Sequence, residues 1–316
     1  KIFDTRGIPK GAIEAAEKGV ENGINTFIGP IFSNETKELK RHFKSNEDLT
    51  FFSLSPDLEN ISKNIIVSGQ NPEEQVSCII QQLAEQRSNK ILLIFHADKY
   101  GYVIRDSFSK FIDNYGISQY ASVEFFEMQK NMNLNDEIKK LSKFEDRKRR
   151  LKNEISRTKN DKTIEKNAKK IRISSLERKL TLDTPFDSIL IASEGDDLLE
   201  ILSHLAFYDI NSDNTDIYGT SLWEDTDKND NVYRGTFYAT SLKDKNEEFV
   251  KSFKNVFSRE PLSLNFYIHD LIDLVQSFKD HDRNQKANKV FYGEFSNSKI
   301  NSGLLQREIY IRRINK

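Results

Sequence analysis

The chain has 316 residues, of which 37% are hydrophobic and 31% are charged, and its formal net charge is -1. This length suits two domains or one large one, and 22 Phe and 11 Tyr are too many for a disordered chain. No apolar run approaches the roughly 20 residues that a membrane-spanning helix needs. The single cysteine, Cys78, excludes an intramolecular disulfide and a cysteine-based metal cluster.

The cellular compartment stays open at this level. No apolar segment of roughly 7–15 residues follows Lys1, so the chain shows no signal peptide. A single thiol suits the cytoplasm, but a large periplasmic domain with an adequate core also needs no disulfide. Composition therefore allows a cytoplasmic protein or an exported one whose leader lies outside this chain.

The segment before residue 90 alternates between helical and strand patterns. Helices are predicted over three segments, 11–22, 34–43 and from Pro72 onward. Strands are predicted over three short apolar runs, 26–28, 49–54 and 65–67. Continuous apolar strands between amphipathic helices are typical of a parallel sheet covered on both faces. Cys78 lies among the apolar positions of the third helix, so we interpret it as a packing residue.

The same alternation continues along the chain. Further strands are predicted at 90–95, 121–126, 188–192 and 216–219. Further helices are predicted at 104–115, 196–208, 247–257 and 265–278. The C-terminal segment Gln306–Arg313 alternates apolar and polar side chains, which predicts one strand with a solvent-exposed face. The pattern as a whole predicts an α/β fold in two lobes.

One segment, 136–180, has almost no strand signal and carries 17 Lys and Arg against 8 Asp and Glu. Its apolar residues fall into two helically spaced sets, Ile138, Leu141, Leu151 and Ile155, then Ile164, Ala168, Ile171, Leu176 and Leu180. The polar stretch Thr158–Lys162 suits a turn between them. We predict an antiparallel helical hairpin inserted between two strands of the second lobe. It is either a solvated decoration or an arm that attracts an anionic partner.

Signatures of the common enzyme classes are absent, since the chain has no glycine-rich phosphate loop, zinc-protease motif or hydrolase elbow. The histidines do not occur at metal-ligand spacing. His96 follows a predicted strand, and we interpret it as a locally hydrogen-bonded residue. Glu194 and Asp196 form an acidic pair near another strand end, which is weak support for acid–base chemistry. We predict no catalysis, no cofactor and no metal.

Hydroxyl groups and glycines gather at the carboxyl ends of predicted strands. They occur in Gly29–Ser33, Ser53–Asp57, Asp98–Gly101 and Gly219–Trp223. In open α/β sheets, ligands bind beyond these strand ends, where helix N-termini offer free N–H groups. Short hydroxyls suit a carboxylate ligand, and Tyr100 and Trp223 are candidates for aromatic walls. Helix capping by serine is the alternative for each hydroxyl.

Several segments together resemble a known family. Thr26–Asp57 resembles the early part of the Leu/Ile/Val-binding type of periplasmic binding protein. The chain as a whole is more narrowly similar to the bacterial penicillin-binding protein activator family. The segments that carry this resemblance are Asp4–Gly7, Ser68–Gln75, Asp98–Gly101, Tyr208–Ile210, Gly219–Trp223 and the basic insertion ahead of Pro185–Leu190.

The resemblance implies a type I periplasmic-binding fold, with two Rossmann-like lobes joined by three crossovers and a central cleft. The lobe boundaries expected from it are 1–88 for lobe 1, 89–232 for lobe 2 with the hairpin at 136–180, 233–290 for a return to lobe 1, and 291–316 for a return to lobe 2. The family's first strand and helix are expected ahead of Lys1. The resemblance also implies export to the periplasm, often as a lipoprotein.

Site residues follow from the resemblance by position. Amino-acid binders of this fold hold the ligand carboxylate with hydroxyls and N–H groups, which correspond here to Ser33 and the pair Ser53 and Ser55. An aromatic side chain at the position of Tyr100 covers the ligand. An acidic side chain takes the ligand ammonium, and Glu194 and Glu224 are both candidates for that role. The activator branch need not bind a small molecule, so the cleft can also be empty.

Two functions remain open from the sequence. The first is a non-enzymatic envelope protein that regulates a peptidoglycan synthase through protein contacts, with the basic hairpin as one contact. The second is a substrate-binding protein of an ABC transporter for an amino acid or a similar small polar solute. Nucleic-acid binding is not predicted, because the hairpin has no helix-turn-helix pattern and no interleaved aromatics. Membrane attachment is expected only through a lipid anchor outside this chain.

Overall fold

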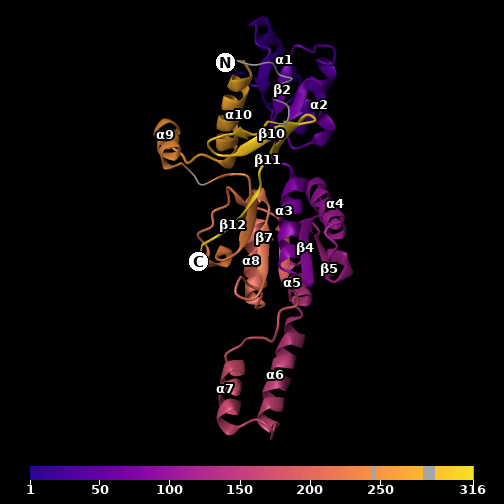
Figure 1. Ribbon diagram of the computed structural model, residues 1–316, viewed down its shortest axis with the longest axis vertical. Coiled ribbons are helices and arrows are strands. Elements are labelled where there is room, and N and C mark those ends of the chain that lie inside the picture. Colours follow the sequence, from indigo (N-terminus) through magenta and orange to yellow (C-terminus); the bar gives the residue numbers. More distant parts are fainter. Residues whose placement is uncertain (244–245, 280–288, 316) are drawn as a thin grey trace. The chain divides into compact units, whose positions relative to one another are not determined.

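The computed structural model describes residues 1–243, 246–279 and 289–315, which divide into two compact units. Unit 1 comprises Lys1–Glu74 and Thr240–Tyr310, and unit 2 comprises Gln75–Ala239 and Ile311–Lys316. The chain therefore passes between the units three times. Each unit is built around one six-stranded sheet with helices on its faces (Figure 1).

The sheet of unit 1 has the strand order β1-β2-β3-β11-β10-β9. Its strands are β1 Thr26–Ile28, β2 Thr50–Ser53, β3 Ile65–Val67, β9 Phe291–Tyr292, β10 Asn297–Asn301 and β11 Leu304–Arg307. The first three strands are parallel to one another and β11 is parallel to β3, while β9, β10 and β11 form an antiparallel meander. The helices of the unit are α1 Pro9–Glu21, α2 Ser33–His42, η1 Leu58–Asn60, α9 Glu247–Phe257 and α10 Ser263–Lys279.

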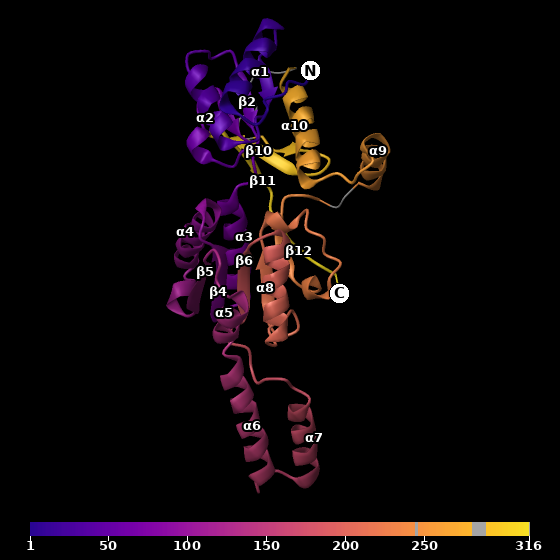
Figure 2. The same cartoon turned by 180° about the vertical axis from the view of Figure 1, so that it is seen from behind.

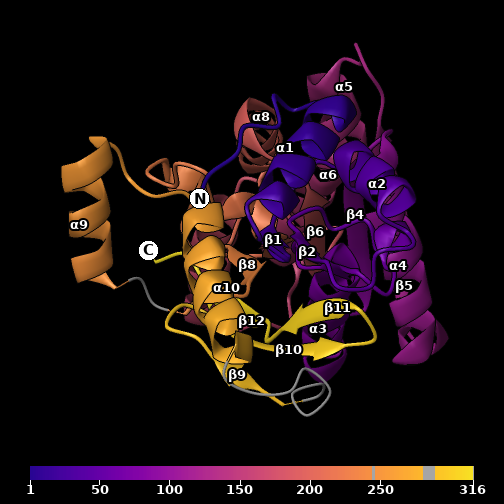
Figure 3. The ribbon, with the colours of Figure 1, turned by 90° about the horizontal axis from the view of Figure 1, so that it is seen from above.

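Two neighbouring residues of β2 show how this sheet is covered. Successive side chains of a strand point to opposite faces. Phe51 packs with Ala12 and Ala16 of α1, and Phe52 packs with Leu271 of α10. Helices α1 and α2 therefore cover one face and α10 covers the other, as the view from above shows (Figure 3).

The sheet of unit 2 has the strand order β12-β8-β7-β6-β4-β5. Its strands are β4 Lys90–His96, β5 Ser122–Met128, β6 Ser188–Ala192, β7 Asp216–Gly219, β8 Phe237–Thr240 and β12 Tyr310–Arg313. Its helices are α3 Pro72–Glu85, α4 Lys99–Asn114, η2 Ile117–Gln119, α5 Leu134–Leu141, α6 Phe144–Asn160, α7 Lys166–Glu177, α8 Gly195–Phe207, η3 Ser221–Trp223 and η4 Asn231–Tyr233. Strands β5, β4, β6, β7 and β8 pair in parallel.

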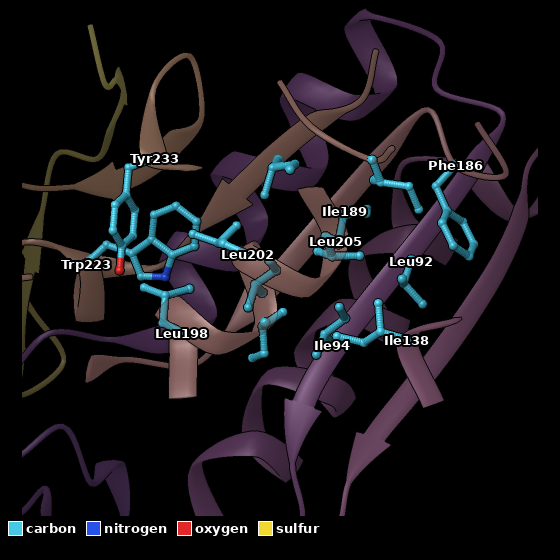
Figure 4. Close-up of a cluster of buried hydrophobic side chains, with 14 of the residues drawn as sticks. Leu92, Ile94, Ile138, Phe186, Ile189, Leu198, Leu202, Leu205, Trp223 and Tyr233 are labelled. Carbon is cyan, nitrogen blue, oxygen red and sulfur yellow. The ribbon is translucent and has the colours of Figure 1, made fainter. Parts of the chain in front are cut away.

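The core of unit 2 follows directly from its apolar pattern. Every residue of β6 is buried, as expected for a strand covered on both faces. One stripe of α8 is also buried, with Leu198, Ile201, Leu202 and Leu205 at helical spacing. This stripe packs in the same cluster as Ile189 and Ile191 of β6 (Figure 4). Cys78 on α3 is half-buried.

The predicted hairpin forms, but it begins later than expected. Helices α6 and α7 lie side by side and extend away from the sheet of unit 2 (Figures 1 and 2). Helix α5 was expected in the hairpin, yet Leu134 and Ile138 lie in the core of unit 2. The apolar stripe of α5 faces α8 and not a second arm, so the projecting part starts near Phe144.

The unit boundaries differ from the expected lobe boundaries at all three crossings, which follow residues 74, 239 and 310 and not residues 88, 232 and 290. Helix α3 belongs to unit 2, because Gln75 Oε1 accepts from the N–H of Ser221 and Gln86 Oε1 accepts from the Tyr218 hydroxyl. Strands β9, β10 and β11 belong to unit 1, because β11 pairs with β3. The expected single strand Gln306–Arg313 is therefore wrong: it is two strands, in different sheets, interrupted at Glu308.

Membrane-spanning helices and metal-binding clusters are both absent from residues 1–243, 246–279 and 289–315. No helix there combines the length and the apolarity needed to cross a bilayer. In the same residues, no group of three or more His, Cys, Asp or Glu side chains is arranged to hold a metal ion.

Candidate functional site

The serines predicted in unit 1 form one hydrogen-bonded network at the carboxyl ends of its strands. Ser53 Oγ lies 2.7 Å from Thr36 Oγ1 and accepts from the N–H of Ser55 at 3.3 Å. Ser55 Oγ accepts from the N–H of Asp57 at 3.3 Å. The hydroxyl of Ser33, in the first turn of α2, donates to Asp57 Oδ2. The network thus joins the end of β2 to the start of α2.

Burial separates these serines into two kinds. Ser53 is 0% exposed and Ser55 is 2% exposed, and all the partners of their hydroxyls are groups of unit 1 itself. Ser33 is half-buried, and Asn60 Nδ2 donates to its Oγ at 3.1 Å. Ser53 and Ser55 therefore act in the internal structure of unit 1, and Ser33 is the serine of the three that has partial access to solvent.

The Ser33 hydroxyl, which was expected to bind a ligand carboxylate, is already bonded to the carboxylate of Asp57. One oxygen accepts from the Ser33 hydroxyl, and the other accepts from the N–H of Glu59 at 3.2 Å. A second carboxylate about 4 Å away would be repelled by about 4 kcal/mol at the effective dielectric constant typical of a protein surface. The first turn of α2 is therefore already supplied with an anion by the chain.

Tyr100 lies at the start of α4 in unit 2, at the carboxyl end of β4. Its hydroxyl donates to Thr220 Oγ1 at 3.0 Å. Burial raises the pKa of Tyr100 well above its ordinary value, and the nearby carboxylates of Glu194 and Asp98 raise this pKa further. The Tyr100 hydroxyl is therefore a proton donor throughout the physiological pH range. Asp98 itself caps α4 through the N–H of Gly101.

Trp223 was expected to form an aromatic wall of the ligand site, but the structure places it in the core of unit 2. It is 0% exposed, its indole N–H donates to the carbonyl of Ser193 at 3.1 Å, and its ring packs against Tyr233 (Figure 4). Gly219 makes this position possible, because a Cβ there would lie 2.1 Å from two atoms of the indole ring. The ring consequently fills the space beside β7.

The two acidic candidates of unit 2 have different settings. Glu194 is exposed at the N-cap of α8, directly after Ser193. Glu224 is half-buried at the end of η3, directly after Trp223. The indole N–H of Trp223 donates to the carbonyl of Ser193. Because Glu194 follows Ser193 and Glu224 follows Trp223, this hydrogen bond brings the backbone segments of the two acids together in unit 2. Of the two, Glu194 is the one whose charge reaches the Tyr100 hydroxyl strongly enough to raise its pKa.

His96 is hydrogen-bonded locally, as predicted for a histidine at a strand end. Its Nε2 lies 2.9 Å from Ser193 Oγ, and the same nitrogen lies 3.8 Å from Asp197 Oδ2. A catalytic Ser-His-Asp arrangement needs the aspartate on the other ring nitrogen. Ser193, His96 and Asp197 therefore lack the geometry of a catalytic triad.

The sequence did not reveal which residues hold these side chains, although Asp57 and Thr220 lie in strand-end segments that it singled out. Asp57, Thr36 and Asn60 complete the network of unit 1, and Ser193 and Thr220 complete that of unit 2. Asp57 had a local signal, because an aspartate after Ser-Pro commonly bonds its own backbone two residues on. The other partners are distant in sequence and have no such signal.

A buried arginine fixes the root of the hairpin to unit 2. Arg147 is 1% exposed, although it lies in the most basic stretch of the sequence. Its guanidinium donates to five backbone carbonyls, those of Ser142, Leu182, Asp183, Tyr208 and Asp209. These carbonyls come from both ends of the hairpin and from the loop before β7. Arg147 therefore joins both ends of the hairpin to unit 2, beside the ring contact of Phe144 with Tyr208.

No protein-family model matches this chain, and no curated protein matches its sequence. Solved structures match it along nearly all its length. An ABC transporter substrate-binding protein from Desulfitobacterium hafniense in complex with Leu matches with a TM-score of 0.64 and 14% identity, over 99% of this chain and 85% of that one. A putative branched-chain amino acid ABC transporter protein from Rhodospirillum rubrum matches with a TM-score of 0.68 and 10% identity, over 99% and 84%.

A third match is of a different kind. The C-domain of LpoA from Haemophilus influenzae, described as a regulator of PBP1A, matches with a TM-score of 0.62 and 12% identity, over 100% of this chain and 87% of that one. The chain has the type I periplasmic-binding-protein fold. Leu/Ile/Val-binding proteins and LpoA are both among its structural neighbours, which agrees with the resemblance seen in the sequence. At 10–14% identity these likenesses establish the fold alone.

Proposed function

We propose that this protein is a non-enzymatic regulator of peptidoglycan synthesis in the bacterial envelope and that it acts through a protein partner. The observation that carries the proposal is the contact between Ser33 and Asp57. A receptor for amino acids needs a free position for the ligand carboxylate, and the Ser33 hydroxyl, which was expected to bind that carboxylate, already donates to Asp57. The likeness to the LpoA domain, a regulator of PBP1A, supports the same direction.

The basic hairpin supports a macromolecular partner. Its helices start at the amino-terminal edge of the sheet, since the contacts of Arg147 are with residues just before β6 and β7. The candidate ligand residues of unit 2 lie at the opposite, carboxyl-terminal edge. The hairpin is consequently too remote from Tyr100 to cover a solute bound beside it, and a role toward another molecule accounts for its position better.

The alternative is a substrate-binding protein of an ABC transporter for an amino acid or a similar small polar solute. It is favoured by the match to a substrate-binding protein in complex with Leu. In this alternative Ser33 holds the ligand, Tyr100 covers it, and Glu194 or Glu224 takes its ammonium. Asp57 would then have to be displaced from Ser33, or the ligand would have to be one without a carboxylate at that position.

One pair of measurements separates the two functions. In the first, the melting temperature of the protein is recorded with each common amino acid and with small peptides. A ligand at a hundred times its dissociation constant adds about 2.7 kcal/mol to the free energy of unfolding, which is easily detected. In the second, the rate of glycan polymerisation by a purified peptidoglycan synthase from the same organism is recorded with and without the protein.

The regulator predicts no melting shift and a changed polymerisation rate. The transport receptor predicts a clear shift with one chemical class and an unchanged rate. An export signal or lipid anchor in the complete gene product would place the protein in the envelope, as the regulator requires. Mass spectrometry of the protein isolated from its natural membrane fraction would detect such an anchor.

A further inference from the structure

The projecting hairpin has far more positive than negative charge. Residues 143–179 carry 15 Lys and Arg against 6 Asp and Glu. Several of the acids are already paired with basic side chains nearby: Asp146 with Arg149 at 2.6 Å, Glu154 with Arg172 at 2.8 Å and Glu145 with Lys139 at 3.3 Å. The remaining basic side chains therefore present an excess of positive charge that the hairpin itself does not neutralise.

Two pairs of exposed lysines illustrate this excess. Lys148 and Lys152 lie one turn apart on α6, and Lys166 and Lys170 lie one turn apart on α7. Lys148 lies over the ring of Phe144, a contact that leaves its charge intact. Within the described part of the chain, none of the four pairs with an acidic side chain within 4 Å. Each pair therefore offers two exposed ammonium groups to two carboxylates of another molecule.

The hairpin lacks the apolar surface that a folded protein face or a membrane-embedded helix would use. Its exposed surface has one strongly exposed large apolar side chain within residues 143–179, Ile171, which is 72% exposed. Folded partners bury an apolar centre with aromatic anchors, and helices that lie in a membrane present a continuous apolar face. The hairpin therefore fits a partner that is held by charge and has little structure of its own.

The spacing of the lysines fits an extended polypeptide. Residues four apart in an α-helix are separated by about 6 Å along the axis. In an extended chain, alternate side chains lie on one side and are separated by about 6.7 Å. We propose that the hairpin binds an extended acidic segment of the partner protein, with carboxylates at alternate positions facing Lys148–Lys152 and Lys166–Lys170. That the acidic segment belongs to a regulated protein partner rests on the proposed function. That the hairpin prefers an extended acidic polypeptide rests on the spacing of the lysines.

The buried root makes such an arm effective. Because Arg147 binds carbonyls at both ends of the hairpin, the helices keep their direction relative to the sheet of unit 2. An arm of fixed direction loses less conformational freedom when it captures a flexible segment. Electrostatic attraction also speeds the encounter of the two molecules. A decoration needed only for solubility would gain nothing from this anchor.

The test uses a fluorescent 16-residue peptide with Glu at alternate positions and Ser between them, and the same peptide with Gln in place of Glu. Binding to the whole chain is measured at 50 and 300 mM salt. The hairpin variant is K148Q/K152Q/K166Q/K170Q, and the matched control is K37Q/K44Q/K110Q/K130Q, which removes the same charge from exposed positions elsewhere. Glutamine keeps a high helix propensity, and circular dichroism checks that both variants fold.

We expect the acidic peptide to bind the wild type and lose at least tenfold in affinity at the higher salt, because exposed ion pairs are screened. The hairpin variant should bind at least about fourfold more weakly, since four exposed ion pairs with the peptide are lost. The control should stay within twofold of the wild type. Equal losses in both variants, or no binding at 50 mM salt, would overturn the proposal.

Two further outcomes separate this inference from the proposed function. Vesicles of phosphatidylglycerol and phosphatidylethanolamine that bind more tightly than the peptide would identify the arm as a membrane contact and overturn the inference. The hairpin variant can also fail to bind the peptide and still change the polymerisation rate as the wild type does. That result would support the proposed regulatory function and would show that the hairpin does not contribute to it. If the peptide binds through the four lysines but no synthase changes its polymerisation rate, the hairpin is a site for acidic polypeptides and the proposed regulatory function is wrong.

Discussion

The hydroxyl of Ser33 donates to the carboxylate of Asp57, so the first turn of α2 already faces an anion that belongs to the chain. The N-terminus of a helix attracts negative charge, and in open α/β folds this attraction is commonly used for ligands. Here the carboxylate of a residue 24 positions further along the chain accepts from the side chain of Ser33 in that first turn. This relationship leaves the Ser33 hydroxyl already bonded within unit 1.

We expect Asp57→Ala to give the protein an affinity for small carboxylates that the wild type lacks. The substitution frees the Ser33 hydroxyl and removes a repulsion of about 4 kcal/mol. Isothermal titration with leucine and with acetate measures the gain. Asp57→Asn is the matched control, because it removes the charge but keeps a side chain of the same shape beside Ser33. A wild type that binds leucine as tightly as Asp57→Ala would show that Asp57 does not block the position.

We expect Arg147→Ala to lower the free energy of unfolding of unit 2 by at least about 3 kcal/mol, because it leaves buried carbonyls without a donor. Urea denaturation followed by circular dichroism measures this change. Cleavage by trypsin within residues 144–180 should also become faster, since the root of the hairpin is released. Arg150→Ala, at an exposed position of the same helix, should change the free energy of unfolding by less than about 0.5 kcal/mol. A similar effect of both substitutions would mean that Arg147 does not anchor the hairpin.

We expect Gly219→Ala to displace Trp223, because the new Cβ would lie 2.1 Å from the indole ring. Trp223 is the only tryptophan of the chain, so its fluorescence reports this site alone. The emission should shift to longer wavelength as the ring meets water, and the protein should lose stability. Gly23→Ala is a useful comparison, because its Cβ would meet no atom within 4 Å although its φ of +75° makes the substitution strained. Unchanged emission from a folded Gly219→Ala protein would be inconsistent with the described packing.

We expect the stability of unit 2 to fall at alkaline pH partly through Tyr218. Burial raises the pKa of this tyrosine above its ordinary value of about 10, and its hydroxyl donates to Gln86 at 2.9 Å. The folded state therefore favours the neutral phenol. This contribution to stability is fully present below about pH 10 and is lost as the pH rises from there through the folded-state pKa.

Urea denaturation of the wild type and Tyr218→Phe between pH 8 and pH 11 checks this expectation. At pH 8 the variant should be less stable by about 1 kcal/mol, because it loses one hydrogen bond. The difference should shrink or reverse toward pH 11, because phenylalanine does not ionise. Parallel curves for the two proteins would show that another group controls the alkaline loss.

Much of the fold was predictable from local patterns. Strands β4 and β6 are continuous apolar runs, and the stripe of α8 has clear helical spacing, so their place in a covered parallel sheet follows from periodicity. The pattern was ambiguous where one apolar stripe suits two partners. Ile138 looks the same in sequence whether it faces a second hairpin arm or the core of unit 2, and the structure places it in the core.

The candidate site was less predictable than the fold. The sequence located the hydroxyls at strand ends, but not which of them are already bonded within the protein. Ser53 and Ser55 are occupied by Thr36 and Asp57, and Trp223 is withdrawn into the core because Gly219 leaves room for it. Of these contacts, the one between Ser53 and Thr36 joins residues 17 positions apart, which no local pattern relates.

By itself, the sequence determined the α/β class, the likeness to periplasmic binding proteins and the presence of a basic helical insertion, because apolar periodicity and charge are properties of neighbouring residues. The tertiary structure alone decided that Gln306–Arg313 is divided between two sheets, that Arg147 is buried in the most basic stretch, and that Asp57 meets Ser33. The physical reason is that hydrogen bonding and burial are settled by long-range packing, which brings together groups that no local pattern relates.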